Sequence, residues 1–179
     1  FDMVWQIVTS YILFIIAFRL TQKKLLSMLA AFLYLLLYFR QDYWHTLQAD
    51  GSLNLPFAIC VLLLISSYDR HSFVKIFLAG IMFTAALLFK YTIISFLPLL
   101  IICFFFYGKE ISSIRIKNFA AFMFGVIFLT GLVVILYVST GAFKEFVNIQ
   151  FVQTPLYTKI AYETETGEFI SSQLLRLFS

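Results

Sequence analysis

Long apolar runs, separated by short polar segments, make up the hydrophobic pattern of this chain. The longest run covers residues 76–106, and a single charge, Lys90, interrupts it near its middle. A helix needs roughly 20 apolar residues to cross a bilayer, so this run is too long for one span and just long enough for two short ones. A lysine at the bilayer centre costs about 2.5–3.5 kcal/mol on insertion scales, whereas a lysine at the interface extends its amine to water. We therefore predict two helices with Lys90 at the reversal between them.

The same alternation continues along the chain and predicts about six spans. We expect an all-α fold, a polytopic transmembrane helical bundle, over residues 1–138. Residues 139–179 have mixed polarity and contain the structure-breaking residues Gly141, Pro155 and Gly167, so we expect an irregular extracytoplasmic loop segment there. The predicted spans cover residues 4–18, 25–39, 55–67, 76–89, 91–106 and 119–138.

The composition agrees with a membrane protein. Hydrophobic residues make up 62% of the chain and charged residues 12%, whereas soluble proteins have roughly 45–50% and 25%. The mean hydropathy is +0.95, which excludes a soluble domain with one anchor. The net charge of +4 is not gathered in a basic cluster, so nucleic acid is not an expected partner. Cys60 and Cys103 lie inside apolar runs without metal-site spacing, and we expect them to be packing residues.

Lysine and arginine gather in alternate loops of the predicted bundle. The loops after the first, third and fifth spans are rich in them, whereas the intervening loops hold only Arg40 and Lys90. Positive charge is enriched in cytoplasmic loops. We therefore expect Lys90, the loop of residues 40–56 and the segment of residues 139–179 to share the outer face. The cations of the cytoplasmic loops are Arg19, Lys23, Lys24, Arg70, Lys75, Lys109, Arg115 and Lys117.

Polar groups that could carry chemistry converge on this predicted outer face. They are Lys90, the loop that holds Asp42, His45 and Asp50, and the C-terminal segment. Lysine is a compact charge suited to phosphate, and the carboxylates could bind a divalent metal ion or a sugar hydroxyl. A plainer interpretation, which the spacing alone favours, is that Lys90 marks a helix end and the loop is solvated surface. No metal-ligand pattern surrounds His45, so no metal site is assigned and a divalent metal stays the one cofactor left open.

Small residues form a face on the fourth predicted span. Gly80, Thr84 and Ala85 are spaced so that they lie on one side of a helix. Such a face allows two helix backbones to approach closely in lipid. We interpret it as a packing surface and not as a functional site.

Three stretches resemble polyprenyl-phosphate-sugar glycosyltransferases. These belong to the dolichyl-phosphate-mannose protein mannosyltransferase-like family, which is glycosyltransferase family 39 and has the C-type fold. Gly80 and Lys90 match a family run that begins with glycine and ends with lysine, and Asp50 stands at an acidic position where glutamate is commoner. The stretches are LQADGSLNLPFAICVLLLIS, FLAGIMFTAALLFKYTIISFLPLLI and, at residues 138–142, VSTGA.

The resemblance implies an enzyme that transfers a sugar from a polyprenyl-phosphate donor to a protein, lipid or glycan acceptor at the outer face of a membrane. It implies a bacterial inner membrane, and it makes Lys90 the candidate for binding the donor phosphate. The chain opens on Phe1 inside an apolar stretch, so we expect an internal fragment. The resemblance then implies that the catalytic base lies before residue 1. The alternatives are a transporter or flippase-type membrane subunit and a non-catalytic structural subunit.

Overall fold

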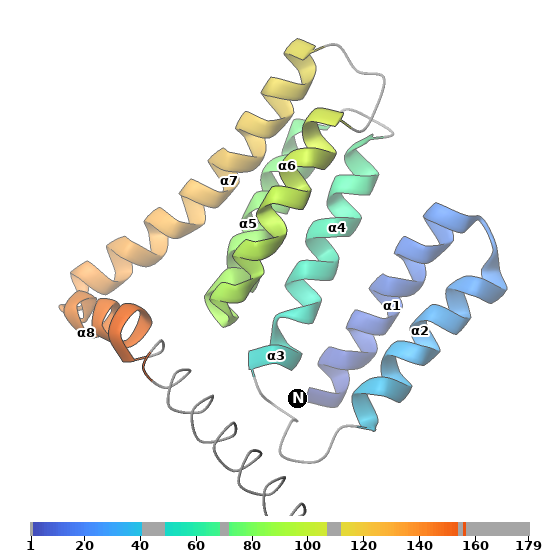
Figure 1. Cartoon of the computed structure of the whole chain (residues 1–179), viewed down its shortest axis with the longest axis horizontal. Helices are drawn as coiled ribbons and strands as arrows, with labels where there is room; N and C mark the ends of the chain where they lie inside the picture. Colours follow the sequence, from blue (N-terminus) through green and yellow to red (C-terminus); the bar gives the residue numbers. More distant parts are fainter. Residues whose placement is uncertain (1, 41–48, 69–71, 107–111, 154–155, 157–179) are drawn as a thin grey trace, which may run out of the picture. The chain divides into compact units, whose positions relative to one another are not determined.

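The computed structural model describes residues 2–40, 49–68, 72–106, 112–153 and 156, and the structural statements below concern these residues. All of their regular secondary structure is helical, which confirms the predicted all-α fold (Figure 1). Two compact units, Phe1–Thr130 and Gly131–Ser179, are described separately. The elements are α1 (Asp2–Thr21), α2 (Lys24–Phe39), α3 (Ala49–Ser52), α4 (Asn54–Tyr68), α5 (Phe73–Phe89), the 3₁₀-helix η2 (Tyr91–Phe96), α6 (Leu97–Phe106), α7 (Ser112–Ser139), α8 (Phe143–Asn148) and the π-helix η3 (Ile149–Gln153).

An apolar helix lies at the place of each predicted span, but the helices differ in length. Two of those described, Asp2–Thr21 and Ile114–Ser139, are long and apolar enough to cross a membrane by themselves. The others are shorter; α2, with 16 residues, rises about 24 Å against a hydrocarbon core of about 30 Å. The count of six spans therefore stays a prediction. The shorter apolar helices are Lys24–Phe39, Asn54–Ser67, Phe73–Phe89 and Thr92–Ile102.

The structure confirms the break in the longest apolar run. Helix α5 ends at Phe89, and Lys90 is extended, with φ −153° and ψ 117°. The N–H of Lys90 donates the last bond of α5 to Ala86 (3.2 Å), and its carbonyl accepts from Ile93 (3.2 Å) where η2 begins. The next element begins as a 3₁₀-helix because Pro98 has no N–H to give to the carbonyl of Ile94.

Two helix positions differ from the expectation. The last predicted span begins at residue 119, whereas α7 already begins at Ser112. The C-terminal segment was expected to be irregular, yet its described beginning forms α8 and η3. Gly141, with φ +73°, ends α7 by adopting a left-handed conformation that glycine adopts without strain, and the chain then starts a new helix. Pro155 and Gly167 lie outside the described residues.

Successive long helices of the first unit run in opposite directions. Asp2, at the start of α1, accepts a hydrogen bond from the hydroxyl of Tyr38 at the end of α2 (2.8 Å). At the other end of α1, Arg19 donates to the hydroxyl of Ser66 near the end of α4 (2.7 Å). Lys75, in the first turn of α5, donates to the carbonyl of the same Ser66 (3.4 Å). Figure 1 shows the resulting up-and-down order of α1, α2, α4 and α5.

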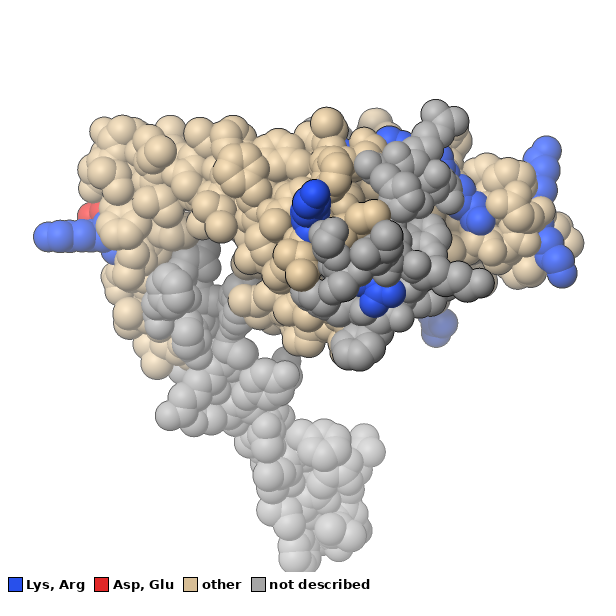
Figure 2. Space-filling model, turned by 90° about the horizontal axis from the view of Figure 1, so that it is seen from above, with Lys and Arg blue, Asp and Glu red and all other residues tan. Residues whose placement is uncertain are grey.

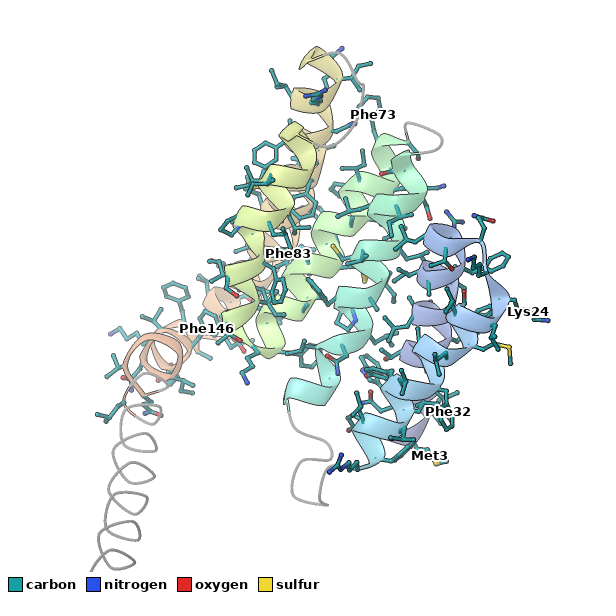
Figure 3. All side chains as sticks on the ribbon, turned by 45° about the vertical axis from the view of Figure 1, so that its right-hand side comes forward. Met3, Lys24, Phe32, Phe73, Phe83 and Phe146 are labelled. Carbon is teal, nitrogen blue, oxygen red and sulfur yellow. The ribbon has the colours of Figure 1, made fainter. Side chains whose placement is uncertain are left out.

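Polar and apolar faces are inverted in α1 relative to a helix of a soluble protein. The buried face carries Gln6, Thr9 and Ser10, whereas Met3 and Val4 are 63% and 65% exposed. Figure 3 shows Met3 and Phe32 projecting outward from α1 and α2. An apolar outer surface of this kind is unfavourable in water and suits hydrocarbon, where polar groups must find partners inside the bundle. The fold thus supports an integral membrane protein.

The hydrophobic core of the first unit lies between α4, α5, η2 and α7. Phe83 of α5 and Phe122 of α7 are buried, with ring centroids 5.7 Å apart. Figure 3 shows Phe83 among the helices. Cys60 of α4 is fully buried in this cluster, which agrees with a packing role. The side chain of Cys103 lies outside the described set.

Helices α5 and α7 touch backbone to backbone at a pair of glycines. A Cβ at Gly80 would overlap the carbonyl oxygen of Phe122, and a Cβ at Gly125 would overlap the carbonyl oxygen of Phe77. The hydroxyl of Thr84 donates to the carbonyl of Gly80 in its own helix (3.1 Å) and to the carbonyl of Val126 in α7 (3.5 Å). The predicted packing face is therefore confirmed for Gly80 and Thr84.

The third member of that predicted face, Ala85, is only half-buried, whereas Ala79 and Ala86 are fully buried. Helix α5 therefore packs against α4 with one part of its surface and against α7 with another. One helix packed by two neighbours buries a wider face than a single small-residue stripe indicates.

Replacing Gly125 with alanine should lower the stability of the folded protein by about 1–3 kcal/mol, because the new methyl group meets backbone that cannot rotate away. Gly131→Ala on the same helix is the matched control, since nothing lies within 4 Å of its added Cβ. Thermal unfolding of the two variants in detergent micelles measures the difference. Equal melting temperatures would show that the close crossing is not required.

Candidate functional site

One end of the first unit is basic. It is the end where α1 and α4 stop and α5 starts, and there the cations Arg19 and Lys75 both bond to Ser66. Figure 2 looks onto this end and shows blue Lys and Arg atoms among tan and grey ones. The exposed residues Lys23 and Lys24 belong to the same end, at the turn from α1 to α2. Through their bonds to Ser66, Arg19 and Lys75 join α1, α4 and α5.

Lys90 and α3 lie at the opposite end of the unit. The half-buried Lys90 follows the last residue of α5, and α3 contacts both α1 and α5. Asp50 is within α3, but its side chain is not among those described. Asp42 and His45 lie outside the described residues. The structure thus brings the backbone of Asp50 to the end of the bundle where Lys90 stands, and it tests no contact between their side chains.

A hydrogen-bonded network that the sequence analysis did not identify joins α1, α2 and α3 at this end. Tyr38 donates to one carboxylate oxygen of Asp2 (2.8 Å), and the amide nitrogen of Gln6 donates to the other (3.1 Å). The same amide nitrogen donates to the carbonyl of Gly51 (3.3 Å). We call Asp2, Trp5, Gln6, Tyr34, Tyr38 and their partners on α3 and α4 the end network.

Two further side chains complete the end network. Tyr34 donates to the amide oxygen of Gln6 and accepts from the amide nitrogen of Asn54 (3.1 Å). Trp5 donates from its indole nitrogen to the carbonyl of Ser52 (3.1 Å). The side chain of Gln6 is 0% exposed, and both ends of its amide are hydrogen-bonded. Such a group holds neighbouring segments in place.

Sequence reasoning had a signal for this network. Asp2 and Gln6 stand four residues apart in a mostly apolar helix, and Tyr34 and Tyr38 have the same spacing on α2. Residues with this spacing lie on one helix face, and polar groups within a span usually face the bundle interior. The pairing of the two faces could not be read from the spacing, because it depends on how α1 and α2 pack.

Metal ligands do not gather in the described part of the chain. No three His, Cys, Asp or Glu side chains lie close enough there to hold a metal ion. The divalent metal that the sequence left open would therefore need ligands from residues such as Asp42 and His45, which lie outside that part.

Comparison with known proteins gives the family. The family model described as dolichyl-phosphate-mannose-protein mannosyltransferase matches residues 1–138. The chain belongs to this family. The matched region contains the end network, α3 and Lys90, and it ends where the last predicted span ends. No curated protein and no solved structure matches the chain.

Family membership confirms the resemblance found in the sequence and implies a membrane glycosyltransferase of the mannosyltransferase type. In general terms the family implies a lipid-linked sugar donor and a glycan or protein acceptor. It favours the transferase over the transporter-type and structural alternatives. The apolar outer surface of α1 and α2 is consistent with this membrane setting.

Tyr38→Phe should lower the stability of the protein by about 1–3 kcal/mol, because it leaves a carboxylate oxygen of Asp2 without its hydroxyl donor. Tyr11→Phe on α1 is the matched control, since Tyr11 is 63% exposed whereas Tyr38 is 7% exposed. Melting curves in the same detergent compare the two variants. A Tyr38→Phe protein as stable as Tyr11→Phe would contradict a structural role for the end network.

Proposed function

We propose that this protein transfers a sugar from a polyprenyl-phosphate donor to an acceptor hydroxyl on a protein, lipid or glycan. The observation that carries the proposal is the family match over residues 1–138, which contains a lysine at a helix end. We further propose that the reaction takes place at the outer face of the membrane. By the family resemblance, that membrane is the inner membrane of a bacterium.

Lys90 is the residue that we propose to bind the donor phosphate. It stands in extended backbone between α5 and η2, at the end of the apolar helix, and it is half-buried. A lipid carrier holds its phosphate at the membrane boundary, because its polyprenyl chain stays in hydrocarbon. An ammonium group there is a compact charge that a phosphate can approach from several directions.

The chemistry follows from this placement. A base removes the proton of the acceptor hydroxyl, and the oxygen attacks the anomeric carbon of the donor sugar. The bond between that carbon and the phosphate oxygen breaks, and the lipid phosphate leaves with the electron pair. Lys90 would stabilise the charge that builds up on the leaving phosphate. Asp50 is our candidate for contacting the sugar or a metal ion, and no described residue is assigned as the base.

The distribution of cations supports the proposed orientation. Arg19, Lys24 and Lys75 lie at one end of the first unit, and Lys90 lies at the other. Because positively charged ends stay in the cytoplasm, the Lys90 end would face outward. The donor sugar would then be used on the side where cell-envelope acceptors are found.

Lys90→Ala should lower sugar transfer on the order of 100-fold, because one donor of charge stabilisation is lost in the transition state. Lys90→Arg should keep part of the activity, since the charge remains. Lys24→Ala is the control; it removes the same charge from an exposed position at the opposite end. Transfer is measured in membranes from a radiolabelled polyprenyl-phosphate sugar, with protein amounts matched by immunoblot. Full activity of Lys90→Ala would disprove the assigned role.

The proposed orientation predicts opposite labelling of two engineered cysteines. Lys24 is the first residue of α2, and Arg40 directly follows its last residue. Both are exposed. In intact spheroplasts, Arg40→Cys should react with a membrane-impermeant maleimide, whereas Lys24→Cys should react only after the cells are opened. The reverse pattern would show that the Lys90 end faces the cytoplasm.

A further inference from the structure

Helix α3 is too short to be stable without help from its surroundings. It has four residues, Ala49–Ser52, whereas isolated helices shorter than about 12–15 residues are marginal in water. The last carbonyls of any helix also have no partner within the helix. Its position therefore depends on α4, to which Leu53 joins it directly, and on contacts from other elements.

Side chains of α1 supply those contacts. The indole of Trp5 donates to the carbonyl of Ser52 (3.1 Å), and the amide of Gln6 donates to the carbonyl of Gly51 (3.3 Å). Both acceptors are terminal carbonyls of α3. Two consecutive residues of one helix thus satisfy the C-terminal end of another helix that lies 45 or more positions later in the chain.

The backbone of α3 at Gly51 packs closely against the side chain of Tyr38 in α2. A Cβ built on Gly51 would lie 2.9 Å from the hydroxyl oxygen of Tyr38 and 3.3 Å from the amide nitrogen of Gln6. Gly51 is buried, and a side chain there would displace the hydroxyl that bonds to Asp2. The short helix is therefore held in two ways, by hydrogen bonds at its end and by close packing along its backbone.

The group that holds α3 is itself held in place. Gln6 is fully buried, its amide oxygen accepts from Tyr34, and its nitrogen is shared between Asp2 and Gly51. With both ends of the amide bonded, the side chain has one favoured orientation. The connection thus runs from α2 through Gln6 to α3.

We propose that Trp5 and Gln6 are positioning residues for the transfer reaction. They fix α3, and through its backbone they fix Asp50, the residue directly before Gly51, at the end of the bundle that carries Lys90. The catalytic part of this inference rests on the proposed function. The structural part, that α1 immobilises α3, does not.

A spectroscopic test addresses the structural part without any activity. A nitroxide label is attached at Ala49→Cys in a Cys103→Ser background; Cys60 is 0% exposed and stays unlabelled. Trp5→Phe removes the indole donor and keeps an aromatic ring, and Gln6→Met removes both ends of the amide at similar size. Either change should make the label more mobile in reconstituted protein. Ser10→Ala, which removes a different bond from the same helix, to Ala31 (3.0 Å), should not.

A double-mutant cycle addresses the catalytic part. Trp5→Phe should lower the turnover number on the order of tenfold and leave the donor KM nearly unchanged, since Lys90 is not touched. If Trp5 acts through Asp50, the same change should cost little further activity in an Asp50→Ala background. Ser10→Ala should leave the turnover number unchanged.

The outcomes separate this inference from the proposed function. An unchanged nitroxide spectrum in Trp5→Phe, or additive losses in the cycle, would overturn the positioning role. A mobile label together with non-additive losses supports it. If Lys90→Ala keeps full activity while the cycle is non-additive, the assigned role of Lys90 fails and the positioning role of Trp5 and Gln6 stands.

Discussion

Lipid offers no hydrogen-bond partners, and this constraint explains why α1 buries polar side chains and exposes apolar ones. Gln6, Ser10 and Thr84 each find their partners on a neighbouring helix or on their own backbone. The end network is the largest group of this kind. It joins α1, α2 and α3 through the buried amide of Gln6 and through the hydrogen bonds of Trp5 and Tyr38, so two much longer helices help to set the position of a four-residue one.

Close packing holds α5 and α7 together. Helices α5 and α7 meet at Gly80 and Gly125, where any side chain would meet backbone. This contact and the Phe83–Phe122 pair place α5, and the end of α5 places Lys90. The residue proposed to bind phosphate and the helix that carries Asp50 are therefore positioned by separate means, packing in one case and hydrogen bonding in the other.

Such a division suits an enzyme that works at a membrane boundary. The donor phosphate must be held at the depth to which its lipid chain confines it, and a lysine at a helix end offers charge there. Groups that contact the sugar need a more exact placement, because small displacements at a reacting centre cost large factors in rate. Buried hydrogen bonds with one favoured orientation provide that placement better than a surface loop does.

The sequence by itself determined the membrane class, the helical fold, the break at Lys90 and the family. Each of these follows from local composition, hydrophobic run length or a short motif, since a charge within an apolar run has few acceptable positions. It did not predict that α7 begins at Ser112 or that the segment after Gly141 starts with a helix, because both boundaries depend on caps and turns. Only the tertiary structure decided that Gln6 and Trp5 hold α3. Their partners lie 45 or more residues away in the chain, and such pairings are fixed by the packing of whole helices.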